Sequence, residues 1–260
     1  MLRTQHEQSS LKNNLPDFQM LKRVLFGLTS IIVLPVSAEV VMNVLRVPHI
    51  DDAAPFMILN QQQQPTSGML FELYERLSRN LGMSLQIQAV PRKLVAQMLL
   101  KGDIDVYCNA TPDWFPQTEL RWSPPLFVHR DLVVSRQHYR DVANFLKYAQ
   151  GRIGTTNEYI YPTLSGLFQT KQLQRVDSFS PRENLRLLQR NHLDTVVVSE
   201  LEFKYFMPKT DELSTLVIAQ NDIQCMYSPL LTSVQVQQFD AELTRMKKQG
   251  ELIEIVDKYQ

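Results

Sequence analysis

The sequence predicts an α/β protein made of two related units. Strands and helices alternate twice along the chain, which is the pattern of sheets wrapped by helices. The 260 residues are enough for two units of roughly 100 residues each. A weak internal repeat supports this division. In each unit, Pro-Arg opens a helix that leads through a tight turn to an apolar residue, an aspartate and a strand, at residues 91–106 and 181–195.

The N-terminal segment has the three parts of a secretory signal peptide. Lys22 and Arg23 precede an apolar run over residues 24–34, and Val36-x-Ala38 supplies a small-residue cleavage site. The run is shorter than the ~20 apolar residues of a membrane span. The alternatives are a buried helix or an anchor. We expect cleavage before Glu39, and therefore a secreted mature chain.

The position of this signal bears on where translation starts and on the cellular compartment of the protein. Residues 1–19 are polar and form an extension upstream of the signal, so Met20 as well as Met1 can be the true start. The residue directly after the cleavage site is Glu39 and not a cysteine, so a lipid anchor is not expected. We expect a periplasmic protein of a Gram-negative cell, because an unanchored receptor stays near the cell only behind an outer membrane.

The first unit contains three predicted strands and two helices. Residues 40–47 are apolar and β-branched, which predicts a buried strand. Leucines at helical spacing over residues 70–81 predict a helix, and residues 85–89 alternate as a strand does. A second helix is expected from Pro91 until Gly102 ends it, followed by a strand at 104–110.

The second unit follows an extended run at residues 127–135. Helices are predicted at 141–150, 158–169 and 181–190, and strands at 152–156, 175–179 and 195–199. Two extended runs come next, at 216–219 and 223–227. The chain closes with a helix through residues 236–246 and a short one through 252–256.

Composition and motifs exclude several functions. The chain has 27 basic and 27 acidic residues, so it lacks the basic surface of a nucleic-acid binder. It contains no H-E-x-x-H or G-x-S-x-G motif, phosphate loop or dinucleotide fingerprint, so we expect no metal and no cofactor. His129, beside Arg130 and Asp131, is interpreted as a solvated strand edge, and Asp51-Asp52 as a polar loop.

Short motifs follow one another in a fixed order along residues 39–260. They are Val44-Leu45-Arg46-Val47 with Ala54-Pro55-Phe56, Gly68-Met69-Leu70-Phe71-Glu72-Leu73, Leu100-Lys101-Gly102-Asp103-Ile104-Asp105-Val106, Asn109-Ala110-Thr111-Pro112, Trp122-Ser123-Pro124-Pro125-Leu126, Gly151-Arg152-Ile153-Gly154-Thr155-Thr156 and Lys248-Gln249-Gly250-Glu251. Together they resemble the bacterial solute-binding proteins of family 3, the receptors of polar amino-acid transporters.

The resemblance implies the two-lobed periplasmic-binding-protein fold of type II, with two parallel-rich sheets joined by two crossing hinge strands. Residues 127–135 would cross outward and residues 223–227 would return. The first lobe would then comprise residues 39–134 and 224–260, and the second lobe residues 135–223. The ligand would bind between the carboxyl ends of the strands of both lobes, and hinge closure would bury it.

The same resemblance implies a set of ligand-binding residues. These are Phe56, Asn109, Ala110, Thr111, Trp114, Thr155, Thr156, Asn157 and Ser199. Alternatives stay open for several of them. Phe56 can belong to the core, Trp114 can pack its loop instead of stacking on a ligand, and residues 155–157 can cap a helix instead of holding an anion. Tyr159 and Tyr161 can line the cleft or belong to the core.

Both groups that usually hold an amino acid in this family are replaced. Relatives hold the α-carboxylate with an arginine three residues after the position of Thr111, where this chain has Trp114. They hold the amino group with an aspartate at the end of the strand that ends here at Ser199. Arg92 and Arg121 are candidate substitutes for the missing arginine, and the identity of the ligand stays open.

The resemblance also places the two cysteines, Cys108 and Cys225, on neighbouring strands. In an oxidising periplasm they can form a disulfide. They can equally remain two buried thiols, because adjacency alone does not provide bridging geometry.

The expected function is capture of a small polar or amino-acid-like ligand by a monomeric receptor, without chemistry on the ligand. The expected partner is an inner-membrane ABC permease or a sensor. One alternative is a periplasmic cyclohexadienyl dehydratase-like enzyme that acts on prephenate or arogenate. The other is a ligand-sensing receptor for a membrane signalling partner.

Overall fold

The computed structural model describes residues 43–50, 54–115, 117–207 and 212–260. The predicted signal peptide and the Asp51-Asp52 loop lie outside these residues. Within them, none of the helices combines the length and the apolar composition that crossing a membrane requires.

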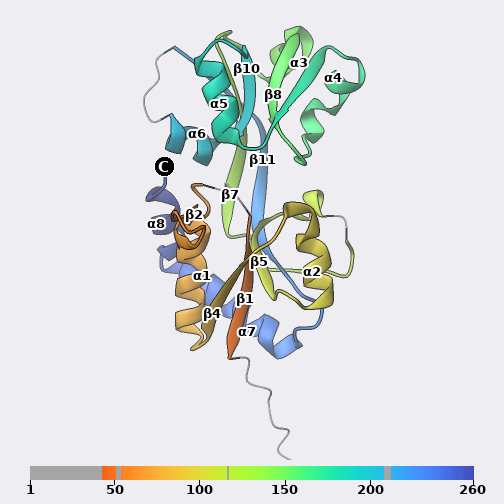
Figure 1. Ribbon diagram of the computed structural model, residues 1–260. Coiled ribbons are helices and arrows are strands. Elements are labelled where there is room, and N and C mark those ends of the chain that lie inside the picture. The colour runs from red at the N-terminus through yellow and green to blue at the C-terminus, as the bar shows by residue number, and fades with distance from the viewer. Residues whose placement is uncertain (1–42, 51–53, 116, 208–211) are drawn as a thin grey trace, which may run out of the picture. The chain divides into compact units, whose positions relative to one another are not determined.

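Buried side chains gather in two regions of the described chain. The first region draws its buried members from residues 45–126 and 225–259. The second draws its members from residues 132–218. We call these regions the first and second lobes (Figure 1). The residue boundaries given above for the two lobes stay a prediction.

The first lobe is built around three strands, and each overlaps one of the three strands that the sequence predicts. Strand β1 (Val44–His49) pairs in parallel with β4 (Ser84–Ala89), and β5 (Val106–Ala110) lies next to β1. In Figure 1, helices α1 (Met69–Asn80) and α2 (Val95–Lys101) flank these strands. The remaining elements are β2 (Ile58–Leu59), β3 (Pro65–Ser67), the 3₁₀ turns η1 (Arg92–Leu94) and η2 (Pro112–Trp114), β6 (Arg121–Trp122), α7 (Ser233–Lys248) and α8 (Glu251–Asp257).

A buried carboxylate ties β1 to the start of β5. Asp105 is only 1% exposed, and its carboxylate accepts hydrogen bonds from the backbone N–H of Arg46 at 2.8 Å and from Nε of the same residue at 3.0 Å. A further contact joins Asp105 Oδ1 to Arg46 Nη2. The aspartate of the sequence motif is therefore structural, since it fixes the strand that leads to the ligand side of the lobe.

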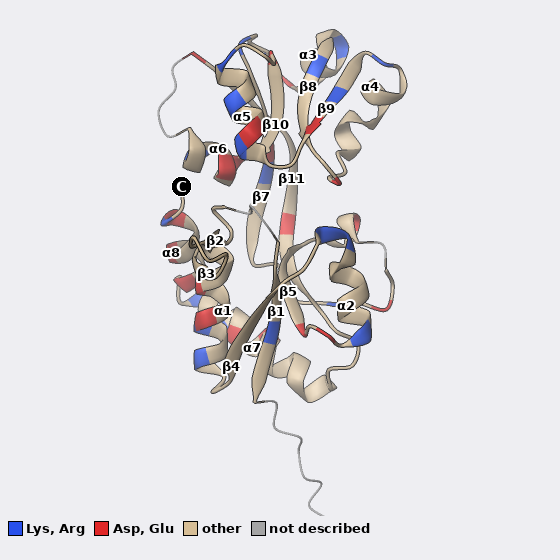
Figure 2. Ribbon diagram, in the orientation of Figure 1, with Lys and Arg blue, Asp and Glu red and all other residues tan. Residues whose placement is uncertain are grey.

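The second lobe is a sheet buried on both faces. Val196 and Val198 of β10 (Thr195–Ser199) pack into one cluster and Val197 packs into the other, because successive strand residues point to opposite faces. This strand carries no charged residue (Figure 2). The other elements are α3 (Val142–Tyr148), β8 (Gly151–Thr156), η3 (Pro162–Leu164), α4 (Ser165–Gln169), β9 (Leu173–Ser178), α5 (Pro181–Gln189) and α6 (Glu200–Phe206).

Two long antiparallel strands run through both lobes. β7 (Phe127–Ser135) has the bounds that the sequence predicts, and it pairs with β11 (Ser214–Tyr227) along most of its length. β11 then pairs with β5, so the sheet order is β5-β11-β7-β10-β8-β9. The two-lobed α/β fold is confirmed, but the sheets differ from the expectation. Seven strands, with β6 paired to β11, form one continuous mixed sheet. Outside it, β1 and β4 form a parallel pair and β2 and β3 form an antiparallel pair.

Two helices differ from the sequence prediction. The helix expected over residues 158–169 begins only at Pro162, as a 3₁₀ turn that continues into α4. A proline at that position suits a first turn and not a helix interior. Helix α6 was not predicted, although Ser199 and Glu202 form a capping box at its start.

A disulfide joins Cys108 of β5 to Cys225 of β11, across a sequence separation of 117 residues. Both cysteines are fully buried in the first lobe. The sequence left open whether the two cysteines form a disulfide or remain two buried thiols, and the structure has the disulfide. Because β5 leads to the ligand side of the first lobe, the bridge braces the strand there.

Candidate functional site: two adjoining cavities between the lobes

Two adjoining cavities lie between the lobes, and each has a volume of about 300 Å³. Their walls include residues at the carboxyl ends of four strands: His49 of β1, Asn109 of β5, Thr156 of β8 and Ser199 of β10. This is where open α/β sheets place ligands. The two cavities share Phe56, Arg92, Asn109, Thr156, Glu158, Tyr159, Pro181 and Glu202.

Arg92 brings a guanidinium group into the wall that both cavities share. It opens η1, where Pro91 turns the chain out of an extended conformation. The guanidinium carbon lies 4.4 Å from the ring centre of Tyr159, 5.9 Å from that of Trp114 and 6.0 Å from that of Phe115. No carboxylate of the described residues lies within 4.0 Å of the guanidinium. A guanidinium that lies among aromatic faces and has no carboxylate in direct contact suits an anionic ligand group.

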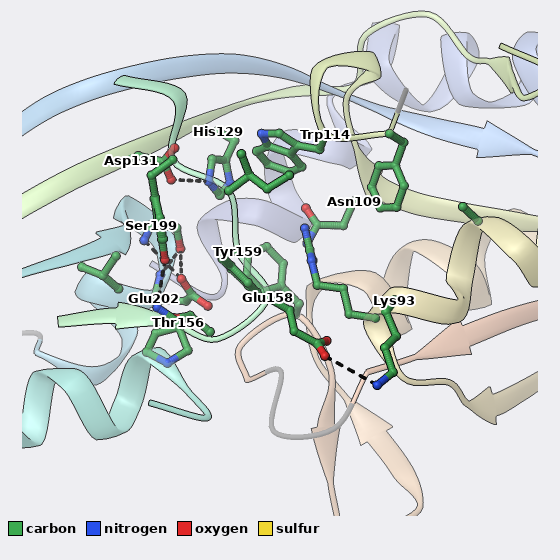
Figure 3. A pocket seen from close by; sticks show the side chains of 18 of the residues that line it. Lys93, Asn109, Trp114, His129, Asp131, Thr156, Glu158, Tyr159, Ser199 and Glu202 are labelled. Carbon is green, nitrogen blue, oxygen red and sulfur yellow. Dashed lines mark hydrogen bonds and ion pairs between the residues drawn. The ribbon is translucent and has the colours of Figure 1, made fainter. Parts of the chain in front are cut away.

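Glu202 brings a carboxyl group into the same shared wall from the second lobe. It is the third residue of α6 and only 4% exposed. Its Oε2 atom accepts hydrogen bonds from the backbone N–H of Ser199 at 3.2 Å and from Ser199 Oγ at 2.5 Å (Figure 3). Burial raises the pKa of Glu202, and the hydrogen bonds from Ser199 oppose this shift only in part.

The middle of β7 contributes a histidine and an aspartate to the first cavity. His129 Nε2 lies 3.0 Å from Asp131 Oδ1, and both side chains are largely buried. The ring of Trp114 meets the ring of His129 edge-on, with 5.3 Å between their centres (Figure 3). Interpreting this segment as a solvated strand edge was wrong, because β7 crosses between the lobes where the cavity lies.

One ion pair spans the two lobes at the cavity. Lys93 Nζ of η1 lies 3.9 Å from Glu158 Oε1, which belongs to the loop after β8 (Figure 3). Two amide oxygens of the first cavity, Asn109 Oδ1 and Gln117 Oε1, are buried and have no hydrogen-bond partner in the described structure. Buried polar atoms are normally paired, so these two oxygens are available to donors of a ligand or of water.

The structure brings together six of the nine residues that the resemblance implied. Phe56, Asn109 and Thr156 line both cavities, Trp114 and Ser199 line the first, and Asn157 lines the second. Whether these residues bind a ligand stays a prediction. Tyr159 and Tyr161, left open between cleft and core, also line the first cavity.

The other three implied residues do not line either cavity. Ala110 is fully buried within β5, and Thr111 is buried at the start of η2. Thr155 is also fully buried, and its Oγ1 donates to Asp177 at 2.7 Å, because alternate residues of β8 point to opposite faces.

The sequence did not settle which charged groups reach the site. Arg92 was one of two candidate cations, and the structure separates them. The guanidinium of Arg121 donates to the backbone carbonyl oxygens of Ser228 and Leu231, so it serves the first lobe and not the cavity. Glu202 was missed, although the capping-box spacing from Ser199 was a signal for its position.

Comparison with known proteins identifies the family. The model of the bacterial extracellular solute-binding proteins, family 3, matches residues 45–260. The chain belongs to this family. No curated protein matches the chain in sequence.

Solved structures of similar fold include amino-acid-binding proteins. An ancestral arginine-binding protein bound to arginine is 16% identical, with a TM-score of 0.67 over 84% of this chain and 99% of that one. The amino-acid ABC transporter substrate-binding protein AbpA of Streptococcus pneumoniae, bound to L-arginine, is 17% identical, with a TM-score of 0.66 over 84% and 94%. The ancestral amino-acid-binding protein AncCDT-1, described as a precursor of cyclohexadienyl dehydratase, is 15% identical, with a TM-score of 0.67 over 84% and 95%.

These similarities establish the type II fold of a ligand-binding family 3 protein. The cavities supply what such a protein needs, which is a partly apolar space between two lobes with a few charged groups that converge on it.

Proposed function

We propose that this protein is a periplasmic receptor that captures a small amino-acid-like ligand between its lobes and delivers it to an inner-membrane ABC permease. Arg92 carries this proposal. Among the described arginines it is the one that lines both cavities, and no described carboxylate lies within 4.0 Å of its guanidinium. A ligand carboxylate would complete the pair with two parallel hydrogen bonds.

Glu202 would bind the amino group of the ligand, at the other end of the head whose carboxylate Arg92 would bind. It faces the shared wall from the second lobe, while Arg92 faces it from the first lobe. The two groups supply a cation and an acid in place of the family clamps that Trp114 and Ser199 replace. A ligand ammonium beside Glu202 favours its ionised form, so binding should release a proton and tighten as the pH rises.

A thermal-shift screen of the purified protein tests the proposal. A ligand that binds only the folded chain raises the melting temperature as its concentration increases. We expect amino acids to produce this shift and neutral sugars to produce none. The proposal fails if no amino acid shifts the melting temperature.

The affinity of the variant Arg92→Gln tests whether the guanidinium of Arg92 contacts the ligand carboxylate. A hydrogen bond to a charged group contributes about 1.5 to 3 kcal/mol, so the variant should bind the best amino acid roughly 10- to 100-fold more weakly. The matched control is Arg79→Gln, an exposed arginine at the end of α1 that lines neither cavity. Equal affinities of the two variants would contradict the role of Arg92.

The location and the partner are tested in cells. We expect the mature chain to begin at Glu39 in a periplasmic extract, as read by mass spectrometry, and to run as a monomer in light scattering. Transport predicts that deletion of the gene abolishes uptake of the labelled ligand. Unchanged uptake together with a lost transcriptional response would favour a sensing receptor.

A dehydratase is the second candidate, and one observation favours it. Glu202 is a buried carboxyl with a raised pKa beside a cavity that holds a guanidinium, which suits a general acid. On prephenate, Glu202 would protonate the departing ring hydroxyl, which leaves as water. The ring carboxylate would leave as carbon dioxide, and its electron pair would complete the aromatic ring. Formation of phenylpyruvate that Glu202→Gln abolishes would establish this activity over simple binding.

A further inference from the structure

The charged groups of the site are not evenly distributed between the two cavities. Lys93, His129 and Asp131 line the first cavity alone, and Arg92, Glu158 and Glu202 lie in the shared wall. The described residues that line the second cavity alone include no aspartate, glutamate, lysine or arginine. They are Pro48, His49, Ile50, Met57, Leu70, Pro91, Tyr107, Asn157 and Phe179.

The apolar members of this second wall come from both lobes. Met57 and Leu70 are buried in the core of the first lobe and present a rigid apolar surface. Phe179 comes from the second lobe, where it follows the end of β9 and precedes α5. Its side chain is 87% exposed, although it is a large aromatic residue at the edge of a cavity.

We propose that the second cavity is a subsite for an uncharged, apolar side chain of the ligand. This inference rests on the proposed function, because the ligand head is assigned to Arg92 and Glu202 in the shared wall. The ligand class is then an amino acid with a large apolar side chain, aromatic or long aliphatic. The second cavity shares Arg92, Asn109 and Tyr159 with the head site, so a ligand held at this common wall is next to both.

Desolvation decides between this class and a charged side chain. A charged ligand group moved from water into the second cavity needs a partner of opposite charge. The described residues that line this cavity alone include no aspartate, glutamate, lysine or arginine. Its charged residues lie in the shared wall, where Arg92 and Glu202 are assigned to the ligand head and Glu158 pairs with Lys93. An apolar group gains free energy in proportion to the area that it removes from water. Aromatic groups bury about 150 to 250 Å² each, and Phe179 would lose exposed area in the same contact.

Isothermal titration of the full protein with four amino acids tests the subsite. L-Alanine has the same head without a large side chain, L-phenylalanine adds an apolar one, and L-arginine and L-glutamate add charged ones. We expect L-phenylalanine to bind at least about tenfold more tightly than the other three. Tighter binding of L-arginine or L-glutamate than of L-phenylalanine would overturn the inference.

The variant Phe179→Ala locates the selectivity. The ratio of the L-phenylalanine and L-alanine affinities should fall about tenfold, because the ring contact exists only with the larger side chain. The matched control is Tyr148→Ala, which removes another exposed aromatic residue of the second lobe that lines neither cavity. An unchanged ratio in Phe179→Ala would contradict the subsite.

The outcomes separate this inference from the proposed function. Binding of amino acids without preference for apolar side chains would leave the receptor proposal standing and remove the subsite. Absence of binding by all four amino acids would contradict the subsite, and it would contradict the receptor proposal as well if the thermal-shift screen also finds no amino acid that binds.

Discussion

Loss of the disulfide between Cys108 and Cys225 should destabilise the protein strongly. The bridge closes a loop with a sequence separation of 117 residues. The chain-entropy relation for a loop of this length gives a stabilisation of about 5 kcal/mol at 25 °C, and removal of native bridges costs roughly 2 to 5 kcal/mol. In a chain of this size each kcal/mol changes the melting temperature by about 2 to 4 °C. We therefore expect the reduced protein to melt about 10 °C lower than the oxidised protein.

The assay compares oxidised and reduced wild-type protein by circular dichroism. Both cysteines are fully buried, so the bridge must be reduced in denaturant and the chain refolded with reductant present. This comparison keeps both sulfur atoms in the core, whereas the double variant Cys108→Ala/Cys225→Ala also removes their packing. Equal melting temperatures for the two forms, or two free thiols in the unreduced denatured chain, would refute the reasoning.

Three further changes probe the fold and the site. Asp105→Asn removes the charge that holds the backbone N–H and guanidinium of Arg46, and should lower the free energy of unfolding by about 2 to 3 kcal/mol in urea titration; a cost below experimental error would contradict this role. Gly68→Ala places a methyl group 2.6 Å from the carbonyl oxygen of Phe56 at a residue with φ of 118°. It should destabilise by about 1 to 3 kcal/mol, and an unchanged urea midpoint would refute that. Burial raises the pKa of Glu202 above its ordinary value of 4.5. At a pH between 4.5 and the raised pKa, the folded chain holds a proton that the unfolded chain has released, so stability falls as the pH rises. Glu202→Gln keeps the acceptor for Ser199 and removes the titration, so the variant should gain stability relative to wild type as the pH rises above 4.5; a difference that does not change with pH would contradict the raised pKa.

Local patterns made most of the fold predictable. Residues 127–135 were predicted as one extended run, and β7 has these bounds, with its last four residues buried in the second lobe. β11 was predicted only as two short runs, because Gln220, Asn221 and Asp222 interrupt its apolar pattern. These polar residues lie where the strand crosses between the lobes, away from either core. The pattern of apolar and polar residues indicates which strand positions are buried. It therefore does not show that a strand continues where it crosses between the lobes and is exposed.

The charged groups of the site were harder to predict than its neutral walls. Phe56, Asn109 and Trp114 follow local motifs, so their approach to the cavity could be expected from the resemblance. Arg92 and Glu202 are 110 positions apart, and their convergence depends on how the two lobes pack. The replacement of both family clamps was readable in the sequence, but the source of the new charges required the structure.

A crystal structure of the protein with its best-binding amino acid tests the central claim most directly. The account predicts ligand between the lobes, with carboxylate oxygens at hydrogen-bond distance from the guanidinium of Arg92 and the amino group facing Glu202. A ligand whose carboxylate is held by another residue, or one bound outside both cavities, would contradict it.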